Sequence, residues 1–525
     1  MTETVDAVVI GAGPNGLVAT IALADAGWDV LLLETNPEVG GAVRSAEVTA
    51  PGFTNDLFSA FYPLAAASPI IKDLDLEGHG LSWVRAPAAL AHHLDDGRAA
   101  LLSHSLDETV ENLEEFAPGD GEAWATMFEE WQTVRDPIID ALFTPFPPVR
   151  AALAALRRLG TAQALELARL AVLPVRRFGD ERFHGDGGPL LLTGNAQHAD
   201  VPPDAAGSGI FGWLLCMLGQ DVGFPVPEGG AQKLADAMAL RAKAAGASIQ
   251  TSARVDRVLV EQGRAVGVRT ADGREVRARK AVLADVAAPV LFRDLVGLEH
   301  LPAKVEQQLD RFHWDSSTLK LNWALREPVP WLAKPARRAG TVHLGPDLTG
   351  FVDLAADLSV GRMPRTPFIL FGQMTTADPT RSPEGTESAW AYTHLPRSFA
   401  VSDSAVLQLM DRVTELLEQH APGFSESVLT LHVQTPADLE AADANLVGGA
   451  INAGTAAIHQ QLVFRPLPGL GRPETPLPGL YLAGASAHPG GGVHGACGWN
   501  AARAALGRGG AVRRRLLRTA WGRLL

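Results

Sequence analysis

Near the N-terminus, the pattern of hydrophobic positions changes its period twice. AVVI, residues 7–10, is uniformly apolar and predicts a short strand, and LVATIALADAG, residues 17–27, predicts a helix that Gly27 ends. A second apolar strand, DVLLLE, follows and finishes at Glu34. Strand, helix and strand in this order predict a β–α–β unit with parallel strands.

The loop inside this unit reads GAGPNG and places three glycines in GxGxxG spacing. Gly11 makes the tight turn, Gly13 lets the backbone approach a pyrophosphate, and Gly16 allows the helix to pack closely on the strand. The free N–H groups of the helix N-terminus suit phosphates, and Glu34 suits the adenosine ribose. We therefore predict a dinucleotide site formed by Gly11, Gly13, Pro14, Asn15, Gly16 and Glu34.

A second match to the same spacing lacks this context. GSGIFG, residues 207–212, follows VPPDAA rather than a strand, and no acidic residue is placed correctly after it. We expect a loop here that packs against WLLCML.

The middle of the chain alternates between helical and strand-like patterns. From about residue 85 to 225, Leu and Ala recur at helical spacing, as in AALAALRRLGTAQALELARL. Residues 252–285 read as a β-meander, with turn signals at Gly263 and at Asp272-Gly273. Residues 300–440 return to alternating strands and helices. One of these strands contains Lys320, and a strand with a single lysine commonly lies at a solvated sheet edge.

A second glycine-rich loop lies near the C-terminus. Residues 480–483 predict a short buried strand, Gly484 begins the loop, and a helix is expected from about Val493 to Leu506. Glycine at 490, 491 and 492 indicates that a ligand approaches the backbone closely. The helix N-terminus favours an electron-rich group at that point.

Length, charge and cysteine content narrow the class of protein. A chain of 525 residues predicts at least two domains, and a formal charge of −14 argues against a nucleic-acid partner. Two cysteines cannot form a disulfide scaffold and favour a reducing cytoplasm. The apolar run 7–24 contains Gly and Pro, so we expect no transmembrane helix. The basic tail 511–525 could lie on an anionic membrane surface or form a frayed or self-docked terminus.

Three motifs carry a resemblance to known flavoproteins. NPEVGGAVRS, which follows Glu34, resembles the extended fingerprint of FAD-dependent oxidoreductases and adds Gly40, Gly41 and Arg44 to the site. AGASAHPGGGVHGACGWNAA closely resembles the C-terminal signature of phytoene desaturase-type flavoproteins. TPADLEAADANLVGGAINAG is similar to the pyridine nucleotide-disulphide oxidoreductase domain protein two group within that superfamily.

The resemblance implies an α+β fold and non-covalent FAD. The FAD domain would comprise residues 1–85, 226–297 and 441–510, and the substrate domain, with a helical lid, residues 86–225 and 298–440. By the same resemblance, backbone at Val255 would contact adenine, and the second glycine loop would run along the flavin. The cofactor residues implied in this way are Val255, Gly484, Gly491, Gly492 and Val493. We expect neither tight NAD(P)H binding nor a metal site.

The resemblance also implies hydride transfer from a C–H or N–H bond to flavin N5. His488 and His494 lie nearest to the flavin by sequence. In flavin amine oxidases, a strand similar to that of Lys320 carries a lysine that holds a water against the flavin. Cys497 suggests either covalent flavin attachment or simple packing.

Three functions remain open at this point. The first is an FAD-dependent oxidoreductase that acts on a lipophilic small molecule, such as an isoprenoid or polyene. The second is a flavin oxidase acting on an amine or an amino-acid-derived metabolite. The third is a lipid-binding escort protein without redox activity, against which the intact glycine loops argue.

Overall fold

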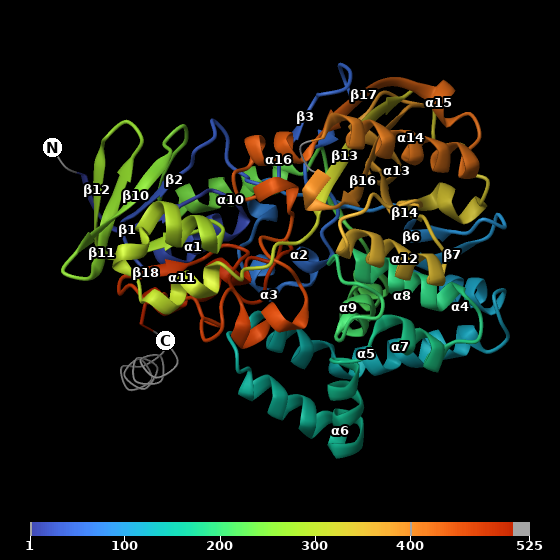
Figure 1. Ribbon diagram of the computed structural model, residues 1–525, viewed down its shortest axis with the longest axis horizontal. Coiled ribbons are helices and arrows are strands. Elements are labelled where there is room, and N and C mark those ends of the chain that lie inside the picture. Colours follow the sequence, from blue (N-terminus) through green and yellow to red (C-terminus); the bar gives the residue numbers. More distant parts are fainter. Residues whose placement is uncertain (1–2, 400–401, 508–525) are drawn as a thin grey trace.

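The computed structural model describes residues 3–399 and 402–507 (Figure 1). Figure 1 shows two sheets side by side and a group of helices beneath the second sheet. The α+β class predicted from the sequence is confirmed.

The first sheet contains the β–α–β unit. Its strand order is β10-β11-β12-β1-β2-β9, and β18 pairs with β12. β1 lies parallel to β2 and β12, and β18 also lies parallel to β12, whereas β10, β11 and β12 form the predicted antiparallel meander. The strands are β1 (Glu3–Ile10), β2 (Val30–Leu33), β9 (Ser248–Gln250), β10 (Val255–Glu261), β11 (Arg264–Thr270), β12 (Glu275–Ala284) and β18 (Leu480–Leu482).

Helices α1 (Pro14–Ala24), α10 (Gln232–Ala244) and α17 (Ala496–Ala505) pack together beside this sheet. α17 approaches α1 so closely that a Cβ on Gly498 would lie 1.8 Å from the carbonyl oxygen of Asn15. Glycine at 498 is therefore required to bring the helix of the second glycine loop against the N-terminus of the first.

The second sheet has the order β17-β13-β16-β15-β14-β6-β7. All nine residues of β13 are buried because it lies between two strands and beneath α14 (Asp403–His420). The expectation that Lys320 lies at a solvated edge is therefore wrong. The strands are β6 (Ala88–His93), β7 (Ala99–Ser103), β13 (Ser317–Leu325), β14 (Ala339–Leu344), β15 (Ile369–Gln373), β16 (Glu387–Leu395) and β17 (Val428–Gln434).

A layer of helices lies below the second sheet in Figure 1. The loop expected at GSGIFG is wrong: helix α9 begins at Ser208, and Gly209 and Gly212 lie inside it. A Cβ on these two glycines would lie 2.7 Å and 2.3 Å from neighbouring backbone oxygens, so they serve helix packing. The helices are α4 (Leu106–Glu114), α5 (Asp120–Phe143), α6 (Val149–Leu170), α7 (Val175–Arg182), α8 (Gly187–Gln197) and α9 (Ser208–Asp221).

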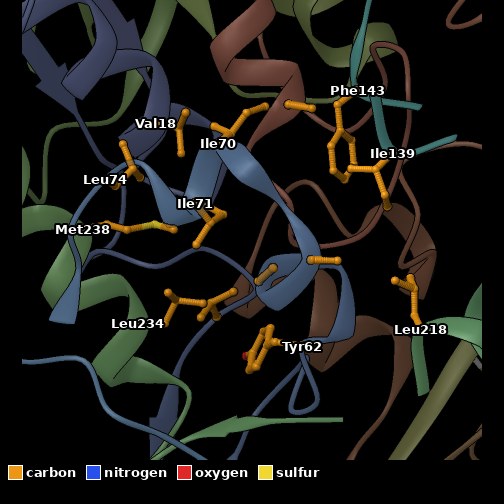
Figure 2. Close-up of a cluster of buried hydrophobic side chains, with 14 of the residues drawn as sticks. Val18, Tyr62, Ile70, Ile71, Leu74, Ile139, Phe143, Leu218, Leu234 and Met238 are labelled. Carbon is orange, nitrogen blue, oxygen red and sulfur yellow. The ribbon is translucent and has the colours of Figure 1, made fainter. Parts of the chain in front are cut away.

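One buried core joins the helices of the first sheet to this helical layer. Figure 2 shows Val18 of α1 near Ile70 and Ile71, with Phe143 of α5 farther along the same cluster. The remaining elements are short apart from α12 (Leu348–Ser359). They are α2 (Pro63–Ala67), α3 (Pro69–Lys72), α11 (Ala303–Leu309), α13 (Met374–Ala377), α15 (Phe424–Ser427), α16 (Pro436–Ala442), β3 (Ser45–Ala46), β4 (Asn55–Asp56), β5 (Trp83–Val84) and β8 (Val226–Pro227).

All strands of the first sheet lie in the residue ranges predicted for the FAD domain, and all strands of the second sheet lie in those predicted for the substrate domain. The boundaries between the two domains stay a prediction. Within residues 3–399 and 402–507, no helix is both long and apolar enough to span a membrane. The basic tail 511–525, with its predicted membrane contact, lies outside the described residues.

Candidate functional site

A cavity of about 540 Å³ lies where the first sheet, the second sheet and α9 meet. The carboxyl ends of β1, β2 and β12 reach one of its ends, because these strands run parallel. Most of the predicted site residues line it: Gly11, Gly13, Pro14, Asn15, Glu34, Gly41, Lys320, Gly491, Gly492, Val493 and His494. The others do not: Gly16, Gly40, Arg44, Val255, Gly484 and His488.

The glycines of the first loop leave room that side chains would fill. A Cβ on Gly13 would lie 2.8 Å from the Asp285 carboxylate, and a Cβ on Gly16 would lie 2.0 Å from the carbonyl oxygen of Gly11. Gly11 itself has φ +91°, which favours glycine. The loop is therefore a cradle whose backbone path requires glycine at positions 11, 13 and 16, and Pro14 and Asn15 of the same loop also line the cavity.

Glu34 closes the far side of this cradle. Its side chain is buried, and its two oxygens accept hydrogen bonds from the backbone N–H groups of Ala12 (2.7 Å) and Asn36 (2.8 Å). Burial raises its pKa, and these hydrogen bonds partly oppose the rise. Each carboxylate oxygen keeps a second lone pair for a ribose hydroxyl.

Asp285 was missed by sequence reasoning. It follows β12 directly, and its Oδ2 accepts the backbone N–H of Gly16 at 2.8 Å. Burial raises its pKa to about 7, so the carboxyl group is partly protonated near neutral pH. An acidic residue at the end of the strand KAVLAD, parallel to β1, is the signal that could have located it.

Gly40 and Arg44 lie outside the cavity lining, whereas Gly41 belongs to it, and all three lie close to the first glycine loop or its neighbours. Arg44 donates to the carbonyl oxygens of Gly41 (2.9 Å) and Ala442 (2.6 Å) and so ties the loop to α16. A Cβ on Gly41 would lie 3.1 Å from Cα of Gly13. The pair of glycines and the arginine therefore position the first glycine loop.

The second glycine loop is held by an arginine that sequence reasoning also missed. Arg465 is buried, and its guanidinium donates to the carbonyl oxygens of Asn452, Gly454, Thr455 and Ala485. Burial lowers its pKa to about 10, so it stays charged at neutral pH. α17 begins three residues after the predicted position, and Val493 belongs to the loop.

The two histidines of this loop differ in position. His494 lines the cavity, its Nδ1 accepts the backbone N–H of Ala496 at 3.0 Å, and burial lowers its pKa to about 4. His488 lies outside the lining, with Nε2 3.2 Å from the carbonyl oxygen of Thr144 at the end of α5. The imidazole of His494 is therefore neutral and lies at the cavity, whereas His488 links the second glycine loop to the end of α5.

Cys497 is buried and does not line the cavity. Its Sγ donates weak hydrogen bonds to the carbonyl oxygens of Ala487 and Gly490, and burial raises its pKa to about 12. A protonated, enclosed thiol favours packing over covalent flavin attachment.

Lys320 points from β13 into the centre of the molecule. Its Nζ donates to the carbonyl oxygens of Asp56 and Phe58, both at 2.6 Å, and lies 4.9 Å from the ring centre of Trp390. Burial lowers its pKa to about 7. The amine can therefore gain or lose a proton near neutral pH beside the cavity.

The part of the cavity next to α9 is mainly apolar, and Asn195 and His198 add polar groups to its lining. Trp390 and Tyr392 of β16 also line the cavity with nearly parallel rings, 6.0 Å between centroids. The aliphatic and aromatic lining of this part includes Phe211, Leu214, Leu215, Leu218, Phe224 and Leu370.

Two glycine loops at strand ends, joined to an apolar chamber, define an FAD-dependent oxidoreductase. The model of flavin-containing amine oxidoreductases matches residues 15–506, and the chain belongs to this family. The predicted superfamily, FAD cofactor and enzymatic class are thereby confirmed, and the escort-protein alternative is not supported.

Relatives agree with this placement. The chain is 32% identical over 95% of its length to mouse pyridine nucleotide-disulfide oxidoreductase domain-containing protein 2, of which 92% is covered. It is 27% identical to lycopene-forming phytoene desaturase of Pseudescherichia vulneris, covering 93% of this chain and 96% of the relative. An oxidoreductase from Methanosarcina mazei shares the fold, with a TM-score of 0.64, 16% identity, and coverage of 95% and 99%.

Proposed function

We propose that the chain removes a hydride from a lipophilic substrate of the isoprenoid or polyene class. The observation that carries this proposal is the distribution of acidic groups along the cavity. Among the described residues that line it, the acidic ones are Glu34, Asp285 and Asp443. Each of them lies beside the first glycine loop, next to Ala12, Gly16 or Gly41.

The chamber beside α9 therefore offers a substrate no carboxylate. A cationic amine would lose its hydration there without gaining an ion pair, which is costly. A neutral hydrocarbon has no charge to desolvate, and its binding is favoured by about 25 cal/mol for each Å² of apolar surface buried. The similarity to a phytoene desaturase supports the same substrate class.

The residues of the chain fit FAD, which when bound accepts a hydride at flavin N5. The first glycine loop and Glu34 would hold the adenosine and pyrophosphate, and Gly491 and Gly492 would lie along the flavin. The chain itself supplies orientation and exclusion of water through the α9 wall. Lys320 can hold or release a proton beside the reaction centre near neutral pH.

A second candidate is oxidation of an amine, and one observation favours it. Tyr62, Trp390 and Tyr392 all line the cavity, and the Lys320 amine lies over the Trp390 ring. Aromatic faces attract amines and cations without a carboxylate. The two candidates differ in the substrate that would reduce the flavin.

We also propose that the protein resides in a reducing cytoplasm. Cys216 and Cys497 are both free and buried, which suits a compartment that keeps thiols reduced. Their buried thiols support this placement.

The test is anaerobic bleaching of the flavin absorbance in the FAD-loaded, full-length protein. Phytoene in detergent micelles and the amine putrescine are added separately. We expect phytoene to bleach the flavin and putrescine to leave it oxidised. Bleaching by putrescine alone would replace the proposal with amine oxidation.

A matched pair of variants tests whether the α9 chamber binds the substrate. Leu214→Gln places an amide in the cavity lining, whereas Leu240→Gln changes an exposed leucine of α10. The Leu214 variant should bleach more slowly at equal flavin content, and the Leu240 variant should match the wild type. Equal rates for all three proteins would contradict a substrate site beside α9.

A further inference from the structure

Exposed apolar side chains gather on two segments close to the cavity. We call them the apolar rim, and each of its side chains is between 37% and 66% exposed. In Figure 1, α6 lies at the outer edge of the helical layer, away from both sheets. The rim consists of Val149, Leu153, Leu156, Leu165, Val172, Ile458, Leu462, Val463 and Phe464.

The two segments of the rim meet at the start of α9. A Cβ on Gly207 would lie 3.4 Å from the carbonyl oxygen of Ala171, just after α6, and 3.6 Å from Cδ1 of Ile458. The backbone N–H of Gly207 also donates to the carbonyl oxygen of Val172 at 3.2 Å. The end of α6 and the segment 458–464 therefore adjoin each other. The backbone of α6 is kinked at Gly160, and Val149, Leu153 and Leu156 lie on the part of the helix before this kink.

This surface continues into the apolar part of the cavity. Gln461 lines the cavity, and the next residue, Leu462, belongs to the rim. Leu142 of α5 and Phe211 of α9 line the cavity as well, and the chain leads from Leu142 into α6 within a few residues. The rim therefore borders the chamber assigned above to the substrate.

The rim carries positive charge in an acidic protein. Residues 149–177 contain six arginines and one acidic residue, Glu166, whereas the whole chain has a formal charge of −14. Four of these arginines form ion pairs with Asp136, Glu181 or Asp204. Arg150 and Arg157 are exposed and form no ion pair within the described part of the chain. Their spacing with Leu153 places all three on one face of α6.

We propose that the apolar rim docks on the surface of a lipid bilayer that contains anionic lipid. Its leucines enter the boundary between headgroups and acyl chains, and Arg150 and Arg157 lie at the lipid phosphates. A lipophilic substrate then enters the cavity from the bilayer without crossing water; this last step rests on the proposed function. The rim is distinct from the basic tail 511–525, which lies outside the described residues.

Vesicle flotation of the full-length, FAD-loaded protein tests this docking surface without any substrate. The vesicles are phosphatidylcholine alone and phosphatidylcholine with phosphatidylglycerol. The rim variant Leu153→Ser/Leu156→Ser is compared with Val360→Ser/Leu407→Ser, which changes two exposed apolar residues elsewhere. A third variant, Arg150→Gln/Arg157→Gln, removes the two unpaired charges, and a fourth ends after Gly507.

We expect the wild type to float with the anionic vesicles. The Leu153/Leu156 variant should lower the vesicle partition coefficient about tenfold or more, because two leucines no longer enter the bilayer. The Arg150/Arg157 variant should bind less tightly only where phosphatidylglycerol is present, and the Val360/Leu407 variant and the shortened chain should still float.

Four results would overturn the proposal. They are no flotation of the wild type, equal losses in the rim and Val360/Leu407 variants, complete loss on removing the tail, and a dimer that the Leu153/Leu156 variant converts to monomer in light scattering. Retained flavin absorbance shows that each variant is folded. Flotation together with no bleaching by phytoene would support the docking surface while contradicting the polyene substrate.

Discussion

Replacing Lys320 with methionine should remove a specific pH dependence from the stability of the protein. Burial lowers the pKa of Lys320 from 10.5 to about 7 in the folded chain. Between these two values the unfolded chain binds one proton more than the folded chain, so stability rises with pH. The amine thus disfavours folding below about pH 7 and ceases to do so as the pH approaches 10.5.

The expected magnitude follows from the two pKa values. Each pH unit inside the window changes the free energy of unfolding by about 1.4 kcal/mol. From about pH 7 to pH 9, the stability of the wild type should therefore rise by roughly 2 kcal/mol relative to Lys320→Met. Between about pH 6 and 7, the difference in free energy of unfolding between the wild type and Lys320→Met should change by less than about 0.5 kcal/mol.

Urea unfolding, followed by tryptophan fluorescence at several pH values with FAD at constant excess, measures this difference. Methionine fills similar space but leaves the carbonyl oxygens of Asp56 and Phe58 without their donor, which adds an offset independent of pH. Lys243→Met, at an exposed position, reports the general effect of removing one lysine. A difference between wild type and Lys320→Met that stays flat from pH 7 to pH 9 would refute the buried, neutral amine.

Three further substitutions test the cradle and the two-sheet fold. Gly16→Ala brings a Cβ within 2.0 Å of the carbonyl oxygen of Gly11 and should lower the flavin content of the purified protein. Gly27→Ala strains the backbone at φ +79°, but its Cβ meets nothing within 4 Å, so this control should retain the flavin. Arg381→Met leaves two buried carboxylates unpaired and should cost about 3–5 kcal/mol in urea unfolding; a smaller loss would show that they are solvated. Trp331→Ala should cost about 3–5 kcal/mol by opening a cavity in the second sheet, with flavin content per folded chain unchanged.

Local patterns predicted the first sheet well because its signals lie close together in the sequence. The loop from Gly11 to Gly16 and the acid at Glu34 belong to one β–α–β unit, whose geometry restricts the choice of residues. The glycines of GSGIFG have the same spacing for another reason, the close packing of α9 on its neighbours. The absence of a preceding strand and of a correctly placed acidic residue distinguished the second motif from the first.

Contacts between distant segments could not be predicted in this way. Asp285 meets Gly16 across 269 positions of the chain, and Lys320 reaches the carbonyl oxygen of Asp56 across 264. Within the described residues, the hydrogen bonds of Arg465 all go to backbone oxygens, which leave no mark on the sequence of their partners. The position of Lys320 depends on how the second sheet faces residues 56–58, and that of Asp285 on the pairing of β12 with β1. Short-range periodicity encodes neither arrangement.

The visible absorbance spectrum of the purified full-length protein tests the central claim most directly. The spectrum is recorded before denaturation and again on the filtrate afterwards. Flavin bands that appear in the native protein and pass into the filtrate are the predicted result, since two glycine loops hold FAD and the Cys497 thiol is enclosed. Absence of flavin after incubation with excess FAD, or bands that stay on the polypeptide, would contradict the account.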